Sequence, residues 1–535
     1  MNATPKVDHT TIPFRHPCRD GSTTRCEACL RMDDLEFEGY IIPGLVSTPR
    51  SVMAELMRAT RAAQNEHHDP ILLRLPPELA SRIFELCIPE FIGRADVRFA
   101  LTSVCQGWRR IALSAPGIWA QRYVNLTGYW RPGPQMLKEW LERSRGVPLR
   151  MAVDAHNPAF STGVDTVSSQ DDDKAKALIE VLNSFSDRWN DVYFSCVPEA
   201  FMELLKGNDK GTPALSSLSL MQVSLPSIQF SLEHVRSARA VSVRNAAMLF
   251  DMAPNMEDCD IPLCSPRYPS FEGQDVLLQP LANRIVHRHL RKLTISLVEW
   301  MWQTENLLRR LTAPALRSLT IPGSTWEEAV DIPFPAVHSL LVDSACVLKE
   351  LCITGSRYKS AELIHLLAQE ALASLVRLEV RANGWSEGER PLSNELFERL
   401  VETAAEGGGG GARRPFLPWL QSLTFEPDEA YSLEVFPDRR FPWDQFLKLF
   451  ACHQRDLQAR WQHMRPLREV KLKLWCPEDK KLDEIIFVDG ETVRSLVELK
   501  WRQKSGVELV VESCGVWGAK DRDLLKDYEP TVDSR

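Results

Sequence analysis

The chain lacks the features that place a protein in a membrane or in an oxidising compartment. No apolar stretch reaches the roughly 18 to 20 residues that a membrane-spanning helix needs, and the first residues, MNATPKVDHT, contain no apolar signal core. The 13 cysteines are odd in number and scattered through 535 residues, which fits reduced thiols better than a framework of disulfide bonds. We therefore expect a cytoplasmic or nuclear protein without membrane contact.

The chain also lacks an excess of positive charge and the short motifs of common enzymes. Its 64 basic and 72 acidic residues give a net charge of −8, and hence no general basic field for nucleic acid. The patterns GxxxxGK(S/T), GxGxxG and HExxH are absent. We expect no nucleic-acid partner and no cofactor.

The segment 75–119 has the pattern of a small helical module. Pro76 suits a helix start, because its φ is fixed and its missing N–H is not needed in the first turn. Leu79, Ile83 and Leu86 follow at helical spacing. They predict one apolar face on a helix that ends before the next proline.

A second and a third helix complete the expected module. The second run keeps the helical period over a set of apolar residues and stops between Ser114 and Pro116. That set consists of Leu101, Val104, Cys105, Trp108 and Ile111. Trp119 and Tyr123 lie four residues apart, which predicts a third short helix. A module of about 50 residues has a marginal core and is usually completed by a partner or a neighbouring domain.

These residues resemble the F-box, in the divergent F-box-like form that is abundant in basidiomycete fungi. The shared pattern is an L-P-x-E-L opening, an I-F-x-L helix, a V-C-x-x-W-R-x-I-A helix and a terminal tryptophan, in that order. The matching residues are Leu75, Pro76, Glu78, Leu79, Ile83, Phe84, Leu86, Val104, Cys105, Trp108, Arg109, Ile111, Ala112 and Trp119.

The resemblance implies a non-catalytic function. In the F-box family the Leu-Pro opening and the apolar faces of the first two helices bind a Skp-type adaptor, which connects the protein to a cullin ubiquitin ligase. By resemblance, the adaptor-binding residues are Leu75, Pro76, Leu79, Ile83, Leu86, Val104 and Trp108. The alternative interpretation is two amphipathic helices of an ordinary α-domain.

A recurring cassette, apolar-x-x-apolar-x-apolar, follows the F-box-like region. It occurs at Leu215, Leu218, Leu220; Ala238, Val241, Val243; Leu290, Leu293, Ile295; Leu316, Leu319, Ile321; Val337, Leu340, Val342; Leu375, Leu378, Val380; Leu420, Leu423, Phe425; and Leu467, Val470, Leu472. Several of the spacings equal one or about two periods of a leucine-rich repeat, which is about 20 to 29 residues long. In such a repeat the last two apolar positions alternate on a short strand and face inward.

Helical segments between the cassettes complete the expected repeats. They run over residues 300–310, 360–371, 394–404 and 444–463. We expect an α/β fold, in which an N-terminal three-helix F-box module is followed by an irregular leucine-rich-repeat-like α/β solenoid. The alternative is a globular α/β domain with L-x-x-L-x-L strands.

A protein target of such a solenoid is expected on the exposed face of the strands. The middle residues of the cassettes point there and share no single chemistry: Ser219, Ser242, Thr294, Thr320, Leu341, Glu379, Thr424 and Lys471. Each is equally well explained as a plain solvated strand position, so the target-binding residues stay unassigned.

A serine-hydrolase pattern is an alternative for one segment. Residues 384–388 fit G-x-S-x-G, with Ser386 as the nucleophile. The residues that would complete the chain order of a triad are Asp428, Asp438 or Asp444, followed by His453 or His463. A nucleophile elbow requires a helix that begins at the serine, whereas Pro391 intervenes before the helix expected near Asn394. We therefore favour a turn and expect no catalytic residue.

One zinc half-site is present near the N-terminus. His16, Cys18, Cys26 and Cys29 lie close together, and the last two have the C-x-x-C spacing of a zinc site. A second C-x-x-C is lacking, and intracellular segments often carry such cysteines without metal. We therefore expect no bound metal. These four residues are the candidate ligands if a metal does bind.

The sequence divides into five parts. They are residues 1–45 with little pattern, an amphipathic helix at 46–69, the F-box-like domain at 70–127, the repeat region at 128–519 and a charged tail at 520–535. Together they predict the substrate-recognition adaptor of a Skp–cullin–F-box ubiquitin ligase, which binds an unidentified protein target through its repeats. The alternative is a scaffold or ligand receptor, outside ubiquitin transfer, whose F-box remnant caps the solenoid.

Overall fold

A computed structural model gives a mixed α/β fold. The residues that it describes are 55, 56, 58–60, 71, 74–88, 97–127, 133–155, 169–221, 223, 225–240, 243–262, 284–296, 301–322, 331–354, 358–381, 392–405, 416–426, 441–451, 467–475, 490–502, 508–514 and 522–528. They form a mostly parallel 14-stranded sheet and a second, 2-stranded sheet. None of the helices in this part of the chain combines the length and the apolar character of a membrane-spanning segment.

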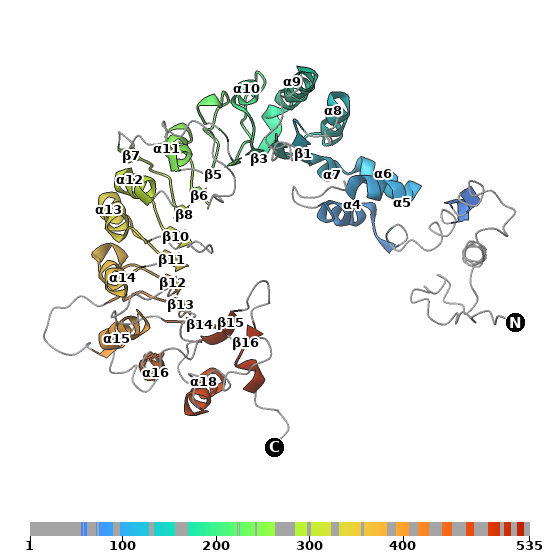
Figure 1. Ribbon diagram of the computed structural model, residues 1–535. Coiled ribbons are helices and arrows are strands. Elements are labelled where there is room, and N and C mark those ends of the chain that lie inside the picture. Colours follow the sequence, from blue (N-terminus) through green and yellow to red (C-terminus); the bar gives the residue numbers. More distant parts are fainter. Residues whose placement is uncertain are drawn as a thin grey trace, which may run out of the picture. The chain divides into compact units, whose positions relative to one another are not determined.

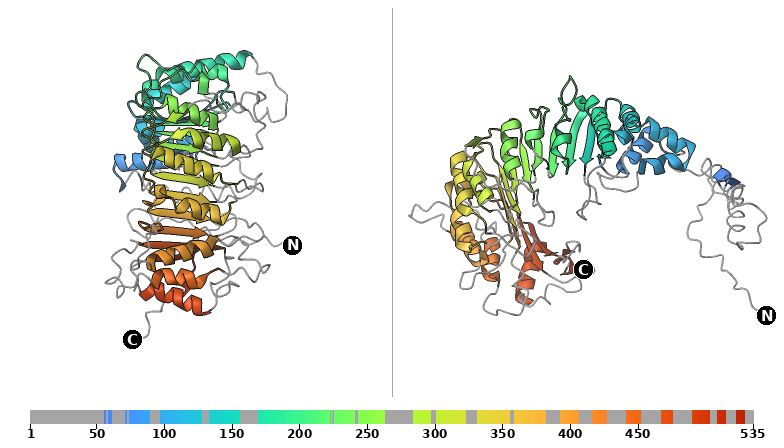
Figure 2. Two further views of the ribbon diagram at one scale, coloured as in Figure 1. Left: turned by 90° about the vertical axis from the view of Figure 1, so that its left-hand side faces the viewer. Right: turned by 45° about the horizontal axis from the view of Figure 1, so that its top comes forward.

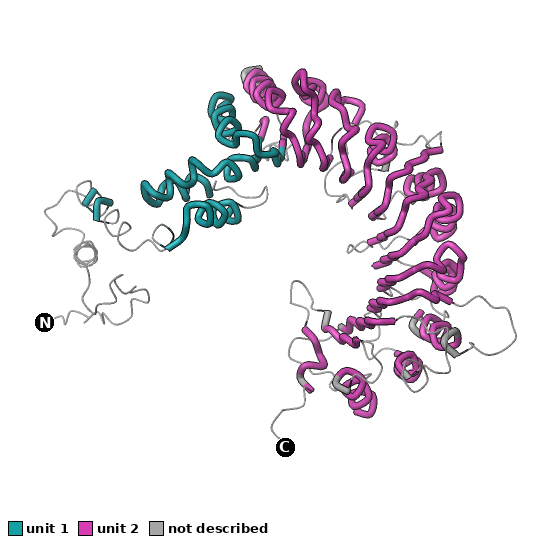
Figure 3. The backbone as a smooth tube through the Cα atoms, turned by 180° about the vertical axis from the view of Figure 1, so that it is seen from behind, with its two compact units in different colours: residues 1–124, 132–152 teal, residues 125–131, 153–535 magenta. Residues whose placement is uncertain are grey.

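The chain folds into two compact units (Figure 3). Unit 1 comprises residues 1–124 and 132–152, and unit 2 comprises residues 125–131 and 153–535. Residues matched to the F-box pattern lie in unit 1, and the recurring cassettes lie in unit 2.

Short helices make up most of the described part of unit 1. The elements up to residue 154 are α4 (Pro77–Leu86), α5 (Val97–Val104), α6 (Gln106–Ser114), α7 (Pro116–Ala120), β1 (Gln121–Asn125), α8 (Pro134–Arg143) and β2 (Leu149–Asp154). Helix α4 begins at Pro77 and ends at Leu86, so the helix predicted from the prolines and the apolar spacing is confirmed.

The expected second helix is wrong in one respect, because two helices take its place. Cys105 has extended backbone angles, with φ −156° and ψ 172°, and this residue separates α5 from α6. An extended residue with a side-chain acceptor is a usual start of a helix. Val104 and Trp108 therefore lie on different helices rather than on one.

The expected third helix is shorter than its two aromatic residues suggested. Helix α7 ends at Ala120 and the chain continues as β1, so Tyr123 lies on a strand and not on the helix of Trp119. Alternate residues of β1, Arg122 and Val124, are buried, which is the period of a strand.

Unit 2 alternates strands with helices. Its α-helices are α9 (Ser169–Ser184), α10 (Glu199–Met202), α11 (Val243–Met252), α12 (Met301–Arg310), α13 (Phe334–Ser344), α14 (Ser360–Leu367), α15 (Leu392–Ala405), α16 (Trp443–Ala451) and α18 (Gly490–Arg502). The helices predicted within 300–310, 360–371 and 394–404 are confirmed as α12, α14 and α15. Helix α16 confirms the first part of the segment 444–463, whose residues from 452 on lie outside the described ones.

Parallel strands form the large sheet of this unit. They are β3 (Trp189–Ser195), β4 (Ser217–Met221), β5 (Ser237–Ala240), β6 (Asp258–Ile261), β8 (Lys292–Ile295), β10 (Ser318–Pro322), β11 (Glu350–Thr354), β12 (Arg377–Arg381), β13 (Ser422–Glu426), β14 (Glu469–Trp475) and β15 (Glu508–Cys514), with β16 (Arg522–Asp523) antiparallel at the end. The small sheet pairs β7 (Ile285–Val286) with β9 (Leu311–Thr312). The α-helices lie along one face of the large sheet, and the other face carries none of the described α-helices (Figures 1 and 2).

The cassettes set the register of the large sheet. Leu293 pairs with Leu319, and Leu378 pairs with Leu423, which in turn pairs with Val470. From β3 to β15, the middle apolar residue of each strand stands opposite that of the next. Because residues two apart on a strand share a face, both apolar side chains of each cassette lie on one side of the sheet, and they are buried.

One expected cassette lies on a helix. Val337, Leu340 and Val342 belong to α13, so their assignment to a strand is wrong. The apolar positions also fit the helical period, and prolines at positions 333 and 335 favour a helix start there. The strand of this repeat is β11, whose buried residues are Leu351 and Ile353.

A second expected cassette is shifted along the chain. Strand β5 ends at Ala240 and helix α11 begins at Val243, so Val243 lies on a helix rather than a strand. The residues that alternate toward the core are Ala238 and Ala240. The buried residues of this strand are small alanines, so the larger valines that follow it led us to place the strand too far along the chain.

In eight of the described repeats, one backbone carbonyl at the amino-terminal edge accepts two hydrogen bonds from the next repeat. The carbonyl of Arg291 accepts from the N–H groups of Arg317 and Ser318, at 2.8 and 3.0 Å. The carbonyls that accept in this way are those of Ser216, Arg236, Glu257, Arg291, Arg317, Lys349, Val376 and Gln421. These bonds fix the register of neighbouring strands at the point where each strand begins.

Candidate functional site

Helix α4 carries apolar side chains on two faces. Ala80 and Phe84 are 0% and 1% exposed and pack into the core of unit 1. Leu79, Ile83 and Leu86 are 53%, 39% and 72% exposed, and we name them the outward face of α4. An apolar stripe at this spacing normally points into a core. Here the stripe adds little to the core of its own unit, which is the property of a docking surface.

The other residues expected to bind an adaptor lie beside α4 or on α5 and α6. Leu75 is partly exposed and Pro76 is exposed, directly before α4. Val104 is 46% exposed at the end of α5. The Trp108 ring is partly buried, because its centroid lies 4.7 Å from that of Phe84. The structure thus joins α6 to α4 through Trp108 and leaves all of the expected residues at least partly exposed.

A sulfur cap lies at the start of α6, the helix that carries Trp108. Cys105 Sγ accepts a hydrogen bond from the backbone N–H of Trp108 at 3.4 Å. A side-chain acceptor three residues ahead of the N–H is the geometry of a helix N-cap. The V-C-x-x-W spacing therefore has a structural reason, because the cysteine caps the helix that carries the tryptophan.

A buried arginine, which the sequence pattern did not single out, connects the helices of unit 1. Arg98 is 9% exposed and donates from Nε to the carbonyl of Ile118 at 2.7 Å. Its Nη2 donates to the carbonyl of Gln121. These bonds tie α5 to α7, which contains Ile118, and to Gln121, the first residue of β1. No sequence signal indicates such a role, since an arginine in an amphipathic helix is ordinarily solvated.

Tryptophan and arginine side chains stack inside unit 1. The Arg122 guanidinium lies 5.0 Å from the ring of Trp119 and 4.2 Å from that of Trp140. Trp119 is 2% exposed and donates from Nε1 to the carbonyl of Ala112 at 2.8 Å. Cation–π contacts of this kind stabilise by about 0.5 to 2 kcal/mol. Trp119, which matches the terminal tryptophan of the F-box pattern, therefore supports the unit from inside.

The sheet face of unit 2 without helices presents the middle residues of the cassettes. Those that hold the expected position are Ser219, Thr294, Thr320, Glu379, Thr424 and Lys471. Leu341 is buried on α13, so its placement on this face is wrong, and Ser242 lies outside the described residues. The register puts Arg239 and Cys352 in the corresponding positions of β5 and β11.

Charged side chains on this face pair across the strands. The ion pairs join Arg239 to Asp260, Arg381 to Glu426, Lys473 to Glu379 and Lys471 to Glu512, at 3.2, 3.1, 3.5 and 2.5 Å. The third pair connects β14 to β12 across the intervening strand β13. Each of these four cations is paired with a carboxylate, so these positions offer a polar surface with little net charge.

Cys352 is held as a neutral thiol on this face. Burial raises the pKa of its thiol to about 12, and the Glu379 carboxylate on the neighbouring strand contributes to the shift. A cysteine acts as a nucleophile or a metal ligand only as the thiolate. Cys352 is therefore an unreactive strand residue at neutral pH.

Most of the residues that suggested zinc binding or hydrolysis are not among those that the structure describes. His16, Cys18, Cys26, Cys29, Ser386, Asp428, Asp438, His453 and His463 are outside the described residues. Asp444 is described and is exposed on α16. Within the described ranges, no group of three His, Cys, Asp or Glu side chains is arranged to hold a metal ion.

No protein-family model matches the chain, and no curated protein matches it. The candidate site is therefore defined by its residues and their geometry alone.

Proposed function

We propose that the protein is a non-catalytic, F-box-like substrate-recognition adaptor of a Skp–cullin–F-box ubiquitin ligase. In this proposal, unit 1 binds a Skp-type adaptor through the outward face of α4, with Leu75, Pro76, Val104 and Trp108 beside it. Unit 2 is a leucine-rich-repeat-like solenoid that binds a target protein. The observation that carries the proposal is the exposure of the outward face, since Leu86 alone is 72% exposed.

The outward face has the properties of a helix that docks onto another protein. Its three aliphatic side chains lie on one stripe, and a partner groove would bury them together. At the observed exposures, complete burial would contribute on the order of 1 to 2 kcal/mol for each side chain. The core of the unit does not need them, because Ala80 and Phe84 already fill the inward side of the same helix.

The register of unit 2 supports a solenoid. Each repeat places one strand beside the previous strand, with its middle apolar residue opposite the preceding one. The described α-helices of unit 2 all lie on one face of the sheet (Figure 2). A stack of such units buries one continuous core and leaves an open strand face for a protein target.

Co-purification of recombinant Skp-type adaptor and cullin with the full-length protein tests the proposal. Leu79→Asp combined with Leu86→Asp places two charges on the outward face and is expected to reduce adaptor recovery at least tenfold. These positions are preferable to Trp108→Ala, because Trp108 also packs on Phe84 and its loss affects folding.

Met136→Asp is the matched control, because Met136 is 41% exposed on α8 of the same unit. This variant is expected to recover the adaptor as the unaltered protein does. Unchanged recovery by a folded double variant contradicts the proposal. Failure of the unaltered protein to recover either component favours instead a scaffold or receptor that has no role in ubiquitin transfer.

A further inference from the structure

The edge of unit 2 at which β8, β10 and β11 begin carries a band of basic side chains. We name these residues the basic edge: Arg284, Arg288, Arg291, Arg309, Arg310, Arg317 and Lys349. All of them are exposed except Arg310, which is partly exposed. The segments 284–292, 309–317 and 343–350 that contain them hold two acidic residues, Asp343 and Glu350, and Arg291 is paired with Glu257 of the preceding repeat at 2.9 Å.

Backbone hydrogen bonds make this band one continuous surface. The Arg317 N–H donates to the carbonyl of Arg291 and the Lys349 N–H donates to that of Arg317, at 2.8 and 2.7 Å. Each of these three basic residues directly precedes one of the neighbouring strands β8, β10 and β11, which lie about 4.8 Å apart. Arg284 Nε donates to Thr312 Oγ1 at 2.9 Å, beside the pairing of β7 with β9.

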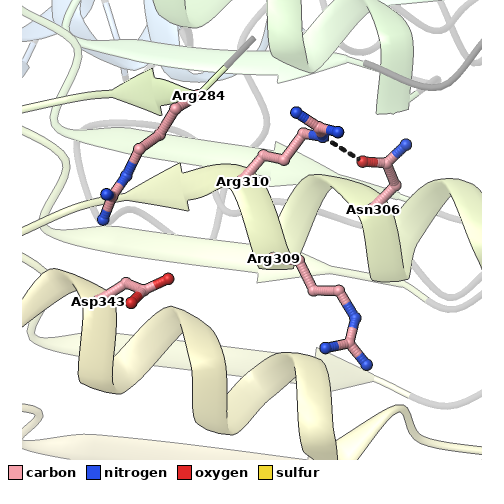
Figure 4. A pocket seen from close by; sticks show the side chains of 5 residues that line it. All are labelled: Arg284, Asn306, Arg309, Arg310 and Asp343. Carbon is pink, nitrogen blue, oxygen red and sulfur yellow. Dashed lines mark hydrogen bonds between the residues drawn. The ribbon is translucent and has the colours of Figure 1, made fainter. Parts of the chain in front are cut away.

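A shallow hollow lies on the helix side of the band (Figure 4). It has a volume of about 380 Å³ and is lined by Arg284, Asn306, Arg309, Arg310 and Asp343. Arg310 donates to Asn306 Oδ1 at 2.8 Å, and Arg309 pairs with Glu305 at 2.7 Å. The neighbouring turn of α12 thus holds both guanidinium groups in place at the rim of the hollow.

Exposed apolar side chains lie between the charges. Val286, Val342 and Val347 are 57%, 55% and 55% exposed. Val286 lies in the first of the three segments, Val347 lies in the third, and Val342 lies on α13 directly before the third. A nucleic acid presents a continuous row of phosphates and offers no apolar side chains to these valines. A polypeptide with spaced acidic groups and apolar side chains complements both the valines and the guanidinium groups.

We propose that the basic edge binds an acidic segment of a partner polypeptide, in which carboxylate or phosphate groups alternate with apolar side chains. Guanidinium groups bind either anion through paired hydrogen bonds. The partner would be the target of the adaptor, and only this identification rests on the proposed function. Binding of the segment itself depends on unit 2 alone and does not require the Skp-type adaptor.

Fluorescence anisotropy with labelled 12-residue peptides and the full-length protein tests this binding. A peptide that alternates glutamate with leucine, or one with phosphoserine in place of glutamate, is expected to bind at least tenfold more tightly than a lysine–leucine peptide. The affinity is expected to fall as the salt concentration rises, because exposed charges are screened. The tighter of the two acidic peptides identifies the preferred anion.

A triple variant locates the binding. Arg284→Gln with Arg317→Gln and Lys349→Gln is expected to weaken the acidic peptides about tenfold, or about 1.4 kcal/mol. The matched control removes three exposed positive charges elsewhere in unit 2, through Lys206→Gln, Lys448→Gln and Lys526→Gln, and is expected to bind as the unaltered protein does. Circular dichroism verifies that both variants are folded.

Three results would overturn the inference. They are equal affinity for acidic and basic peptides, equal losses in the triple variant and its control, and tighter binding of single-stranded DNA of the same charge. Adaptor recovery by the triple variant is expected to be unchanged, since the outward face of α4 is intact. Peptide binding and adaptor recovery therefore test the basic edge and the function proposed for unit 1 independently.

Discussion

The imidazole of His287 donates a hydrogen bond from Nε2 to the carbonyl oxygen of Ala253, at 3.1 Å. The direction follows from the other ring nitrogen, because Nδ1 accepts from the backbone N–H of Leu290 at 3.1 Å. The ring is 2% exposed and packs edge-on against Phe250, with centroids 5.6 Å apart. Only the neutral ring can make both bonds, so this histidine ties two segments of unit 2 together in its uncharged form.

Acid is predicted to weaken unit 2 through His287. Burial lowers the pKa of His287 in the folded protein, and nearby His289 lowers it further, while the bond to Ala253 acts in the opposite direction. The unfolded chain therefore binds this proton more readily than the folded chain. The contribution of the neutral ring to stability is complete above the ordinary pKa of about 6.5 and is lost as the pH falls below it.

Thermal unfolding between about pH 7.5 and pH 5.5 measures this loss. His287→Gln is expected to be less stable at the upper pH and to lose less stability toward the lower pH than the unaltered protein does. His234→Gln is the control, because it removes an exposed histidine of unit 2 that does not contribute to the pKa shift of His287. Equal pH dependence in His287→Gln and the unaltered protein would show that His287 is not the titrating group.

Cys105 is predicted to stabilise α6 by capping rather than by its size. Cys105→Ser keeps a side-chain acceptor for the Trp108 N–H and is expected to preserve stability. Cys105→Val has a similar volume without the acceptor and is expected to destabilise α6 by about 0.5 to 2 kcal/mol. Hydrogen exchange at the Trp108 amide provides the measurement. Equally slow exchange in the valine variant would argue against the cap.

Arg98 is predicted to stabilise unit 1 through its buried hydrogen bonds. Arg98→Met keeps the aliphatic length but leaves the carbonyls of Ile118 and Gln121 without this donor, which costs about 1 to 3 kcal/mol. Arg109→Met is the matched control, because Arg109 donates to the Thr102 carbonyl at 2.8 Å from an exposed position. Unfolding by urea, followed by tryptophan fluorescence, is expected to begin at a lower concentration for the first variant only. Identical curves for both would mean that burial does not strengthen these bonds.

The sequence predicted elements well where local pattern and tertiary packing agree. The prolines and the apolar spacing from Leu79 to Leu86 located α4, and cassettes with leucine, isoleucine or valine at the inward positions located strands such as β8, β10 and β14. Periodicity alone did not show which side of α4 is covered, because both sides are apolar. The neighbouring helix decides this, through the contact of Trp108 with Phe84.

Prediction was wrong where the decisive interaction lies outside the local pattern. The apolar spacing in α13 fits a strand as well as a helix, and Ala238 is too small to suggest a buried strand position. The cassettes centred on Val192 and Cys259 have tryptophan or methionine at the first position, and were missed. Arg98 is fixed by bonds to residues 20 or more positions away, which no local period encodes. The zinc and hydrolase residues outside the described ranges stay predictions.

The carbonyl that accepts two hydrogen bonds at the start of a repeat fixes the register of the next strand, whatever the length of the connection between them. Leu218 pairs with Ala238, and Leu423 pairs with Val470, in the same register although the second connection is more than twice as long. Closing a longer loop costs little additional entropy, since this cost grows only with the logarithm of loop length. New segments can therefore be inserted between repeats without disturbing the sheet, and the molecule can gain recognition loops while its framework keeps the same hydrogen bonds.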